Sequence, residues 1–159
     1  MTEQTNFQKV SHLNNCFGNK PVTYKDDKWA IAVKQLGLIQ EELVELIGGV
    51  EAQNIKEVRD AISDVLVTTY GLAHRLGINA DADMEAVQQS NMSKLCKTEE
   101  ELQATMAYYY EETGIEVYSG GEFPEAYVKS SKDQDGKDGK FYPAHKFLKN
   151  TNWHEPVLS

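Results

Sequence analysis

Residues 65–73, VLVTTYGLA, limit most strongly what this chain can fold into. They belong to a predicted helix over residues 54–76, which begins amphipathic and then becomes apolar around its whole circumference. A helix that is apolar on every side must be buried on every side. The segment therefore predicts an all-α fold, a bundle of about four to five helices, in which this helix is central or lies in a dimer interface.

Apolar residues at helical spacing predict the remaining helices. With the central helix, the predicted set covers residues 6–17, 29–47, 54–76, 81–95 and a segment that starts at the capping box of residues 98–101. Gly48 and Gly49 are expected to weaken or end the second helix, and Asp81 is expected to cap the fourth. Residues 1–95 are thus predicted to form a helical core.

The remaining residues, 96–159, are predicted to add a helix, a small hairpin and a lysine-bearing tail to the same domain. The hairpin would pair residues 115–118 with residues 126–130. Residues 132–140 are polar and contain glycine, which indicates a mobile loop.

The composition narrows the possible partners. The 159 residues carry a formal charge of −9, which argues against nucleic acid as a partner because polyanion binding needs a basic surface. Cys16 and Cys96 are too few for a disulfide framework or a zinc site. No signal peptide and no run of the roughly 20 apolar residues that span a bilayer is recognised, so no membrane partner is expected and a cytoplasmic location is predicted.

Five carboxylates concentrate on two of the predicted helices. Glu41, Glu42 and Glu45 lie on the second helix, and Asp60 and Asp64 lie one turn apart on the central helix. Mg²⁺ takes oxygen ligands and is usually held by carboxylates together with substrate phosphates. If the two helices pack side by side, these residues predict a metal and nucleotide site.

The alternative is that these acidic residues are solvated and paired with lysines, as charge runs on helices usually are. Against it, no lysine or arginine shares the face of Asp60 and Asp64, and that face continues into the apolar part of the helix, so Asp64 is expected to be partly enclosed. Gln35 falls on the same strip of the second helix as Glu42 and Glu45.

These residues resemble the MazG-like nucleotide pyrophosphohydrolases, which are related to phosphoribosyl-ATP pyrophosphohydrolase. The Glu-Glu-x-x-Glu element of that family is matched by residues 41–45, and its second acidic element falls on Asp64. Ala61 stands where the family has a glutamate. Either Asp60 replaces that glutamate, or the pair Glu57 and Asp60 is the true match.

Residues 69–78 and 89–95 resemble a dimeric branch of that family, which includes phage-type and dUTP-cleaving members. The resemblance implies that Asn91 contacts the base or sugar and that Lys94 contacts phosphate. The tail resembles a lysine-bearing segment of the same branch, which implies phosphate contacts by Lys146 or Lys149.

The resemblance implies hydrolysis of a (deoxy)nucleoside triphosphate to the monophosphate and pyrophosphate, in control of the nucleotide pool. Mg²⁺ is the expected cofactor and Mn²⁺ a possible one. Catalytic roles are expected for Glu41, Glu42, Glu45 and Asp64, metal contacts for Glu42, Glu45, Asp60 and Asp64, and a substrate contact for Gln35. A homodimer, or a dimer of dimers, is expected. Two alternatives remain: a phosphoribosyl-ATP pyrophosphohydrolase, and a helical protein that binds nucleotide or metal without turnover.

Overall fold

The computed structural model describes residues 3–158 and is mostly helical, with two small hairpins near the C-terminus. It divides into two compact units, Met1–Ala82 and Asp83–Ser159. In the described part of the chain, no helix is long and apolar enough to cross a membrane.

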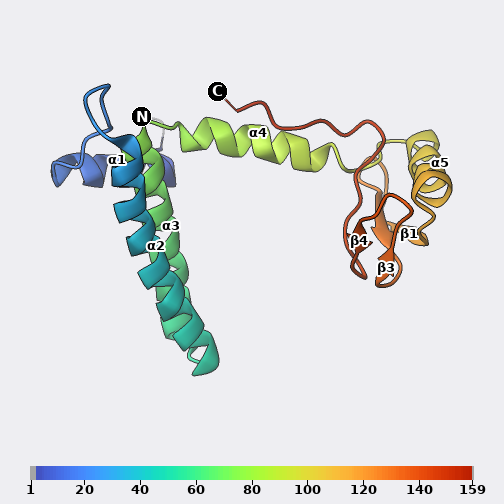
Figure 1. The fold of residues 1–159 in the computed structure, drawn as a ribbon, viewed down its shortest axis with the longest axis horizontal. Coiled ribbons are helices and arrows are strands. Elements are labelled where there is room, and N and C mark those ends of the chain that lie inside the picture. Colours follow the sequence, from blue (N-terminus) through green and yellow to red (C-terminus); the bar gives the residue numbers. More distant parts are fainter. Residues whose placement is uncertain (1–2, 159) are drawn as a thin grey trace. The chain divides into compact units, whose positions relative to one another are not determined.

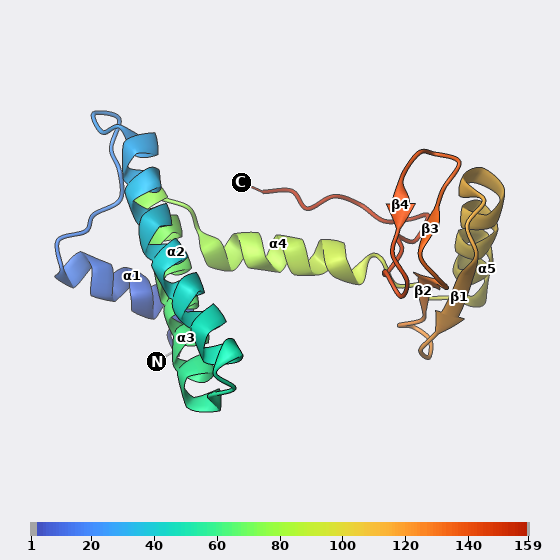
Figure 2. The same cartoon turned by 60° about the horizontal axis from the view of Figure 1, so that its bottom comes forward.

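Three helices form the N-terminal unit: α1 (Asn6–Cys16), α2 (Lys28–Glu51) and α3 (Ile55–Leu76). Side-chain caps begin each of them: Thr5 in a capping box with Gln8, Asp27, and Asn54. α2 and α3 form a hairpin and lie side by side along their lengths (Figures 1 and 2). The two segments that carry the predicted acidic site are therefore direct neighbours.

α2 does not end at Gly48 and Gly49, as predicted, but continues to Glu51. The reason is the packing of α3. A Cβ atom at Gly49 would lie 3.1 Å from the backbone nitrogen of Val58, so glycine at this position permits a close approach of the two helices instead of ending one. The chain then turns through residues 52–54.

The fourth helix, α4, covers Ala80–Met92. Asp81, the predicted N-cap, lies inside it, and its carboxylate accepts a hydrogen bond from Thr5 Oγ1 at 2.7 Å. The side chain of Asn79 instead accepts from the backbone nitrogen of Ala82. Asp81 therefore connects α4 to the start of α1 instead of capping its own helix.

The predicted capping residue Thr98 begins α5 (Glu99–Tyr108), which continues as a π-helical turn, η1 (Tyr109–Thr113). Gly114, with a φ angle of 70°, ends this turn. The strands β1 (Val117–Gly120) and β2 (Tyr127–Ser130) then pair antiparallel, Val117 opposite Ser130.

The predicted loop over residues 132–140 is partly structured. β3 (Gln134–Asp135) pairs antiparallel with β4 (Phe141–Tyr142), so the glycine-bearing segment is the turn of a second hairpin. The Tyr142 hydroxyl donates a hydrogen bond to Asp138 inside this turn.

The two units differ in how much apolar surface they bury. The core of the C-terminal unit consists of Cys96, Leu102, Tyr109, Ile115, Ala126, Val128, Tyr142 and Leu148. In residues 3–82, by contrast, the only buried apolar side chains are those of Val10 and Ala61. The expectation that residues 65–73 are enclosed on all sides is not met within one chain, since Leu66 is 49% exposed.

Candidate functional site

The register of the α2–α3 hairpin is fixed near both of its ends. Gly49 approaches Val58 at the turn, and Gly71 approaches Gln35 toward the other end. Because the helices run antiparallel between these contacts, Glu42, midway along, lies opposite Asp64. The predicted acidic residues of the two helices thus face each other.

The electrostatics of Glu42 support this arrangement. Desolvation raises the pKa of the Glu42 carboxyl above its ordinary value, and the negative charges of four neighbours raise it further. In decreasing order of effect, these neighbours are Asp64, Glu45, Glu41 and Asp60. The other four carboxylates that the sequence singled out therefore all act on Glu42.

Glu45 and Asp60 also share a cavity of about 230 Å³ near the turn of the hairpin. Glu57 lines the same cavity, and so does Ala61, whose side chain is 3% exposed. Glu57 is absent from the charges that act on Glu42, whereas Asp60 is present. Asp60 belongs to both alternatives for the missing glutamate. The charges that act on Glu42 include its partner Asp64 in the first alternative, whereas the cavity includes its partner Glu57 in the second. The residue that completes the ligand set stays a prediction.

Gln35 is half-buried at the other end of the hairpin. Its Nε2 donates a hydrogen bond to the backbone oxygen of Thr68 at 3.3 Å. In the described conformation this side chain joins α2 to α3, and its predicted contact with substrate stays a prediction.

A cation fits the charge of this group, although no metal geometry is formed. Within residues 3–158, no three acidic, histidine or cysteine side chains converge closely enough to hold a metal ion. The ion pairs in the same residues are Lys132–Glu116 and Lys140–Asp138, so none of the five carboxylates has a basic partner. The negative charges near the Glu42 carboxyl favour a proton or a bound cation at this position.

Asn91 and Lys94 are brought together in the C-terminal unit. Lys94 Nζ donates a hydrogen bond to Asn91 Oδ1 at 2.7 Å, and Lys94 is half-buried while Asn91 is exposed. An amide and an ammonium group at this separation can serve neighbouring parts of one ligand.

The two tail lysines have different surroundings. Lys146 lies 5.6 Å from the ring centre of Tyr142 and is exposed. Lys149 lies 3.2 Å from the ring centre of Trp153 and lines a cavity of about 430 Å³ in the C-terminal unit. The sequence predicted the lysines but missed this cavity; its only signal was the run of tyrosines at residues 108–110.

Comparison with known proteins gives two results. A family model described as phosphoribosyl-ATP pyrophosphohydrolase matches residues 12–91, a range that contains all five carboxylates and Asn91. The "Uncharacterized protein L479" of Acanthamoeba polyphaga mimivirus is 33% identical over an alignment 100 residues long, and the alignment covers 58% of this chain. The match spans 40% of the length of that viral protein.

Proposed function

Because the chain belongs to the phosphoribosyl-ATP pyrophosphohydrolase family, we propose that it hydrolyses a (deoxy)nucleoside triphosphate to the monophosphate and pyrophosphate. The observation that supports this most is the group of four carboxylates whose charges act on Glu42 across the α2–α3 hairpin. Such a group suits a polyphosphate substrate only when cations lie between them. The reaction would serve control of the nucleotide pool.

The proposed ligands of Mg²⁺, or of Mn²⁺, are Glu42, Glu45, Asp60 and Asp64. Glu42 and Asp64 face each other across the hairpin, and Glu45 and Asp60 share the neighbouring cavity. When bound, the cation neutralises the phosphate chain and lowers the pKa of a water molecule.

The carboxylates also have a role in proton transfer. One of them, within the set of Glu41, Glu42, Glu45 and Asp64, orients a water and accepts its proton as the oxygen attacks phosphorus. The P–O bond to the pyrophosphate group breaks, and its electrons leave with pyrophosphate. Catalysis in this scheme consists of positioning and charge compensation.

The remaining contacts to the nucleotide are assigned to polar residues outside the carboxylate group. Asn91 would contact the base or sugar, Lys94 the phosphates, and Gln35 the substrate near α3. Lys146 or Lys149 would add a second cation from the tail. In a chain of net charge −9, specific cations are required because the overall field repels the ligand.

A homodimer, or a dimer of dimers, belongs to the same proposal. The apolar side chains of α2 and α3 that remain 49–71% exposed include Trp29, Val33, Val44, Ile47, Ile55 and Leu66. Large apolar side chains exposed in this number on two paired helices are typical of an interface. A second copy of the same hairpin offers the matching apolar surface.

The decisive experiment is a pyrophosphate-release assay over a panel of canonical and modified (d)NTPs and phosphoribosyl-ATP. The protein is first treated with EDTA, and Mg²⁺ or Mn²⁺ is then restored. We expect metal-dependent release of pyrophosphate and a monophosphate from at least one triphosphate, and release slower by on the order of 100-fold or more from the Glu42→Gln variant. Turnover of phosphoribosyl-ATP alone, or metal and nucleotide binding without turnover, would contradict the proposal in favour of one of the two alternatives.

A further inference from the structure

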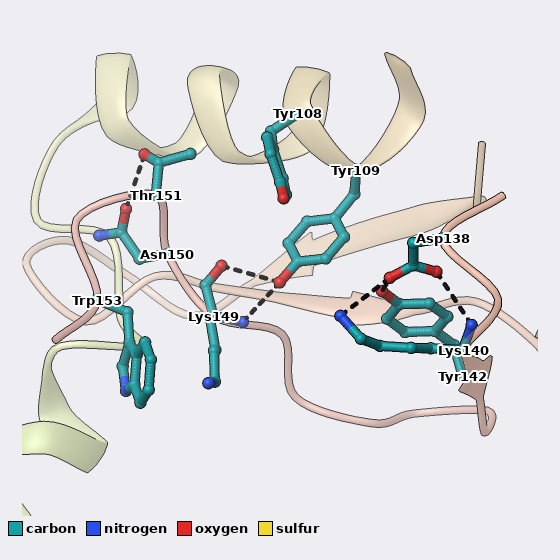
Figure 3. A pocket seen from close by; sticks show the side chains of 9 residues that line it. All are labelled: Tyr108, Tyr109, Asp138, Lys140, Tyr142, Lys149, Asn150, Thr151 and Trp153. Atoms are coloured by element: carbon teal, nitrogen blue, oxygen red, sulfur yellow. Dashed lines mark hydrogen bonds and ion pairs between the residues drawn. The ribbon is translucent and has the colours of Figure 1, made fainter. Parts of the chain in front are cut away.

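The C-terminal unit contains a second polar cavity, of about 430 Å³ (Figure 3). Its walls come from the end of α5, the second hairpin and the tail, and consist of Tyr108, Tyr109, Asp138, Lys140, Tyr142, Lys149, Asn150, Thr151 and Trp153. Cavities that hold small ligands have volumes of about 300–1,000 Å³. This one is therefore large enough for one mononucleotide-sized molecule.

Most polar groups of this cavity are already engaged. Asp138 accepts from Tyr142 at 2.8 Å and pairs with Lys140 at 3.2 Å. The hydroxyl of Tyr109 donates to the backbone oxygen of Lys149 at 3.1 Å and accepts from its backbone nitrogen at 3.0 Å (Figure 3). These bonds fix the wall that carries Lys149 without using its ammonium group.

The Lys149 ammonium is the available charge. Among residues 3–158 it has no carboxylate within ion-pair distance, whereas Lys140 is neutralised by Asp138. It lies over the Trp153 ring, a cation–π contact that an anion can outcompete. The cavity thus offers one cation, the Lys149 ammonium, to a ligand.

The aromatic rings supply the second half of the recognition. Tyr108 is 47% exposed at the cavity wall, and Trp153 is half-buried there. Stacking of a nucleobase on such rings tolerates every base, because every base has a π-face. A ligand that carries both a planar ring and a phosphate can therefore use the aromatic rings and the Lys149 ammonium at the same time, whereas a ligand with only one of these groups uses only one of them.

We propose that this cavity is a nucleotide-binding site of the C-terminal unit, in which the base stacks on Tyr108 or Trp153 and the phosphate pairs with Lys149. The site needs no metal ion and stands independently of the proposed hydrolysis at the acidic hairpin. Assigning Lys149 to this cavity leaves Lys146 as the tail lysine for the triphosphate.

Fluorescence of Trp153 can test the proposal on the full-length chain. The chain has two tryptophans, so the Trp29→Phe variant reports on Trp153 alone. In EDTA, titration with adenosine or thymidine 5′-monophosphate should change the emission saturably. Adenosine without phosphate, and inorganic phosphate alone, should each bind at least tenfold more weakly.

Variants in the same background separate the two contacts. Lys149→Ala should weaken binding about tenfold or more, as expected for loss of a charge-assisted hydrogen bond, and Lys149→Arg should retain it. Tyr108→Leu should also weaken binding. The matched controls are Lys97→Ala and Tyr110→Leu, which change exposed residues of the same unit outside this cavity. Circular dichroism and thermal unfolding verify that each variant is folded.

Three results would overturn the proposal: no saturable change with either monophosphate, unchanged affinity in folded Lys149→Ala, or equal affinity for inorganic phosphate and the nucleotide. Adding Glu42→Gln should leave this affinity unchanged. A negative result in the pyrophosphate-release assay and a negative result in the fluorescence titration can therefore be distinguished.

Discussion

Glu42 of α2 faces Asp64 of α3, and among the neighbouring charges that of Asp64 raises the pKa of Glu42 most. The two carboxylates come from separate helices, so their approach is a property of the hairpin and not of either sequence motif alone. Removing the charge of one of the two carboxylates therefore tests whether the pair binds a metal ion.

Replacing Glu42 or Glu45 by Gln should reduce kcat on the order of 100-fold or more, because several kcal/mol of metal-based charge stabilisation are lost. The fold should persist, since the substitution keeps the side-chain volume and removes repulsion. Steady-state pyrophosphate release and thermal unfolding measure the two effects. Glu51→Gln, an exposed change at the end of α2, is the control. Wild-type rates in Glu42→Gln would exclude the metal-site interpretation.

Stability should depend on pH through Glu42. Its pKa in the folded protein is raised above 4.5, the value assigned to a free glutamate, by desolvation and by neighbouring negative charges. The folded state therefore binds the proton of Glu42 more tightly than the unfolded state does. The resulting contribution to the free energy of unfolding is fully present below pH 4.5 and is lost as the pH rises through the pKa of the folded state. In EDTA, the Tm of wild type should fall relative to that of Glu42→Gln as the pH rises toward neutral, because only wild type gains a charge at this position. A pH-independent difference would be inconsistent with this account.

The metal ligands on α3 can be ranked. Asp60→Asn and Asp64→Asn should each weaken Mn²⁺ binding, whereas Glu57→Gln should change it little, because Glu57 is not among the charges that act on Glu42. Calorimetric titration of Mn²⁺ provides the measurement. The reverse order would move the ligand set toward the turn of the hairpin, to Glu57 and Asp60.

Lys94→Ala should raise KM, lower kcat, or both, by about one to a few kcal/mol in kcat/KM, as for a lost charge-assisted hydrogen bond. Asn91→Ala should instead change the ranking among bases or sugars more than the rate on the best substrate. Because the two side chains are hydrogen-bonded at 2.7 Å, their effects should not be additive in a double-mutant cycle. Additive effects with an unchanged substrate ranking would place both residues outside the substrate site.

The dimer prediction is tested on α2. Val33→Asp and Val44→Asp place a charge at side chains that are 69% and 67% exposed in one chain. If a second copy covers these valines, each substitution removes about 1.5–3 kcal/mol of apolar burial from the free energy of association. Burying the new carboxylate destabilises the dimer further. Light scattering at micromolar concentration should show a dimer or tetramer for wild type and a smaller species for the variants. Tyr110→Ser, an exposed change outside this surface, should leave the assembly intact, and a monomeric wild type would refute the prediction.

Local signals predicted the helices and the acidic faces well, because caps, end glycines and carboxylate spacing act within a few residues of one helix. Gly48 and Gly49 misled the prediction, since the role of Gly49 depends on Val58 across the hairpin. Likewise, Asp81 has the residue type of an N-cap, yet its partner Thr5 lies far away in the sequence. Contacts between distant segments carry no local pattern.

Contacts between distant segments also determine the structure of the lysine-bearing tail. Its sequence predicts an appended segment, but Leu148 is 3% exposed and Asn150 is 5% exposed in the C-terminal unit. Removing residues after Gly139 would therefore test folding as well as the role of Lys149. Point variants are the appropriate probes.

The burial of Asn150 has a consequence for the order in which the chain folds during synthesis. Its amide donates to the backbone oxygen of Leu95 and accepts from Thr105 Oγ1, contacts that join segments 55 and 45 residues apart. The α2–α3 hairpin, joined by a short turn, is completely synthesised by residue 76. The C-terminal unit lacks the Asn150 contacts until residue 150 has emerged, so the whole acidic hairpin leaves the ribosome before the C-terminal unit can complete its core.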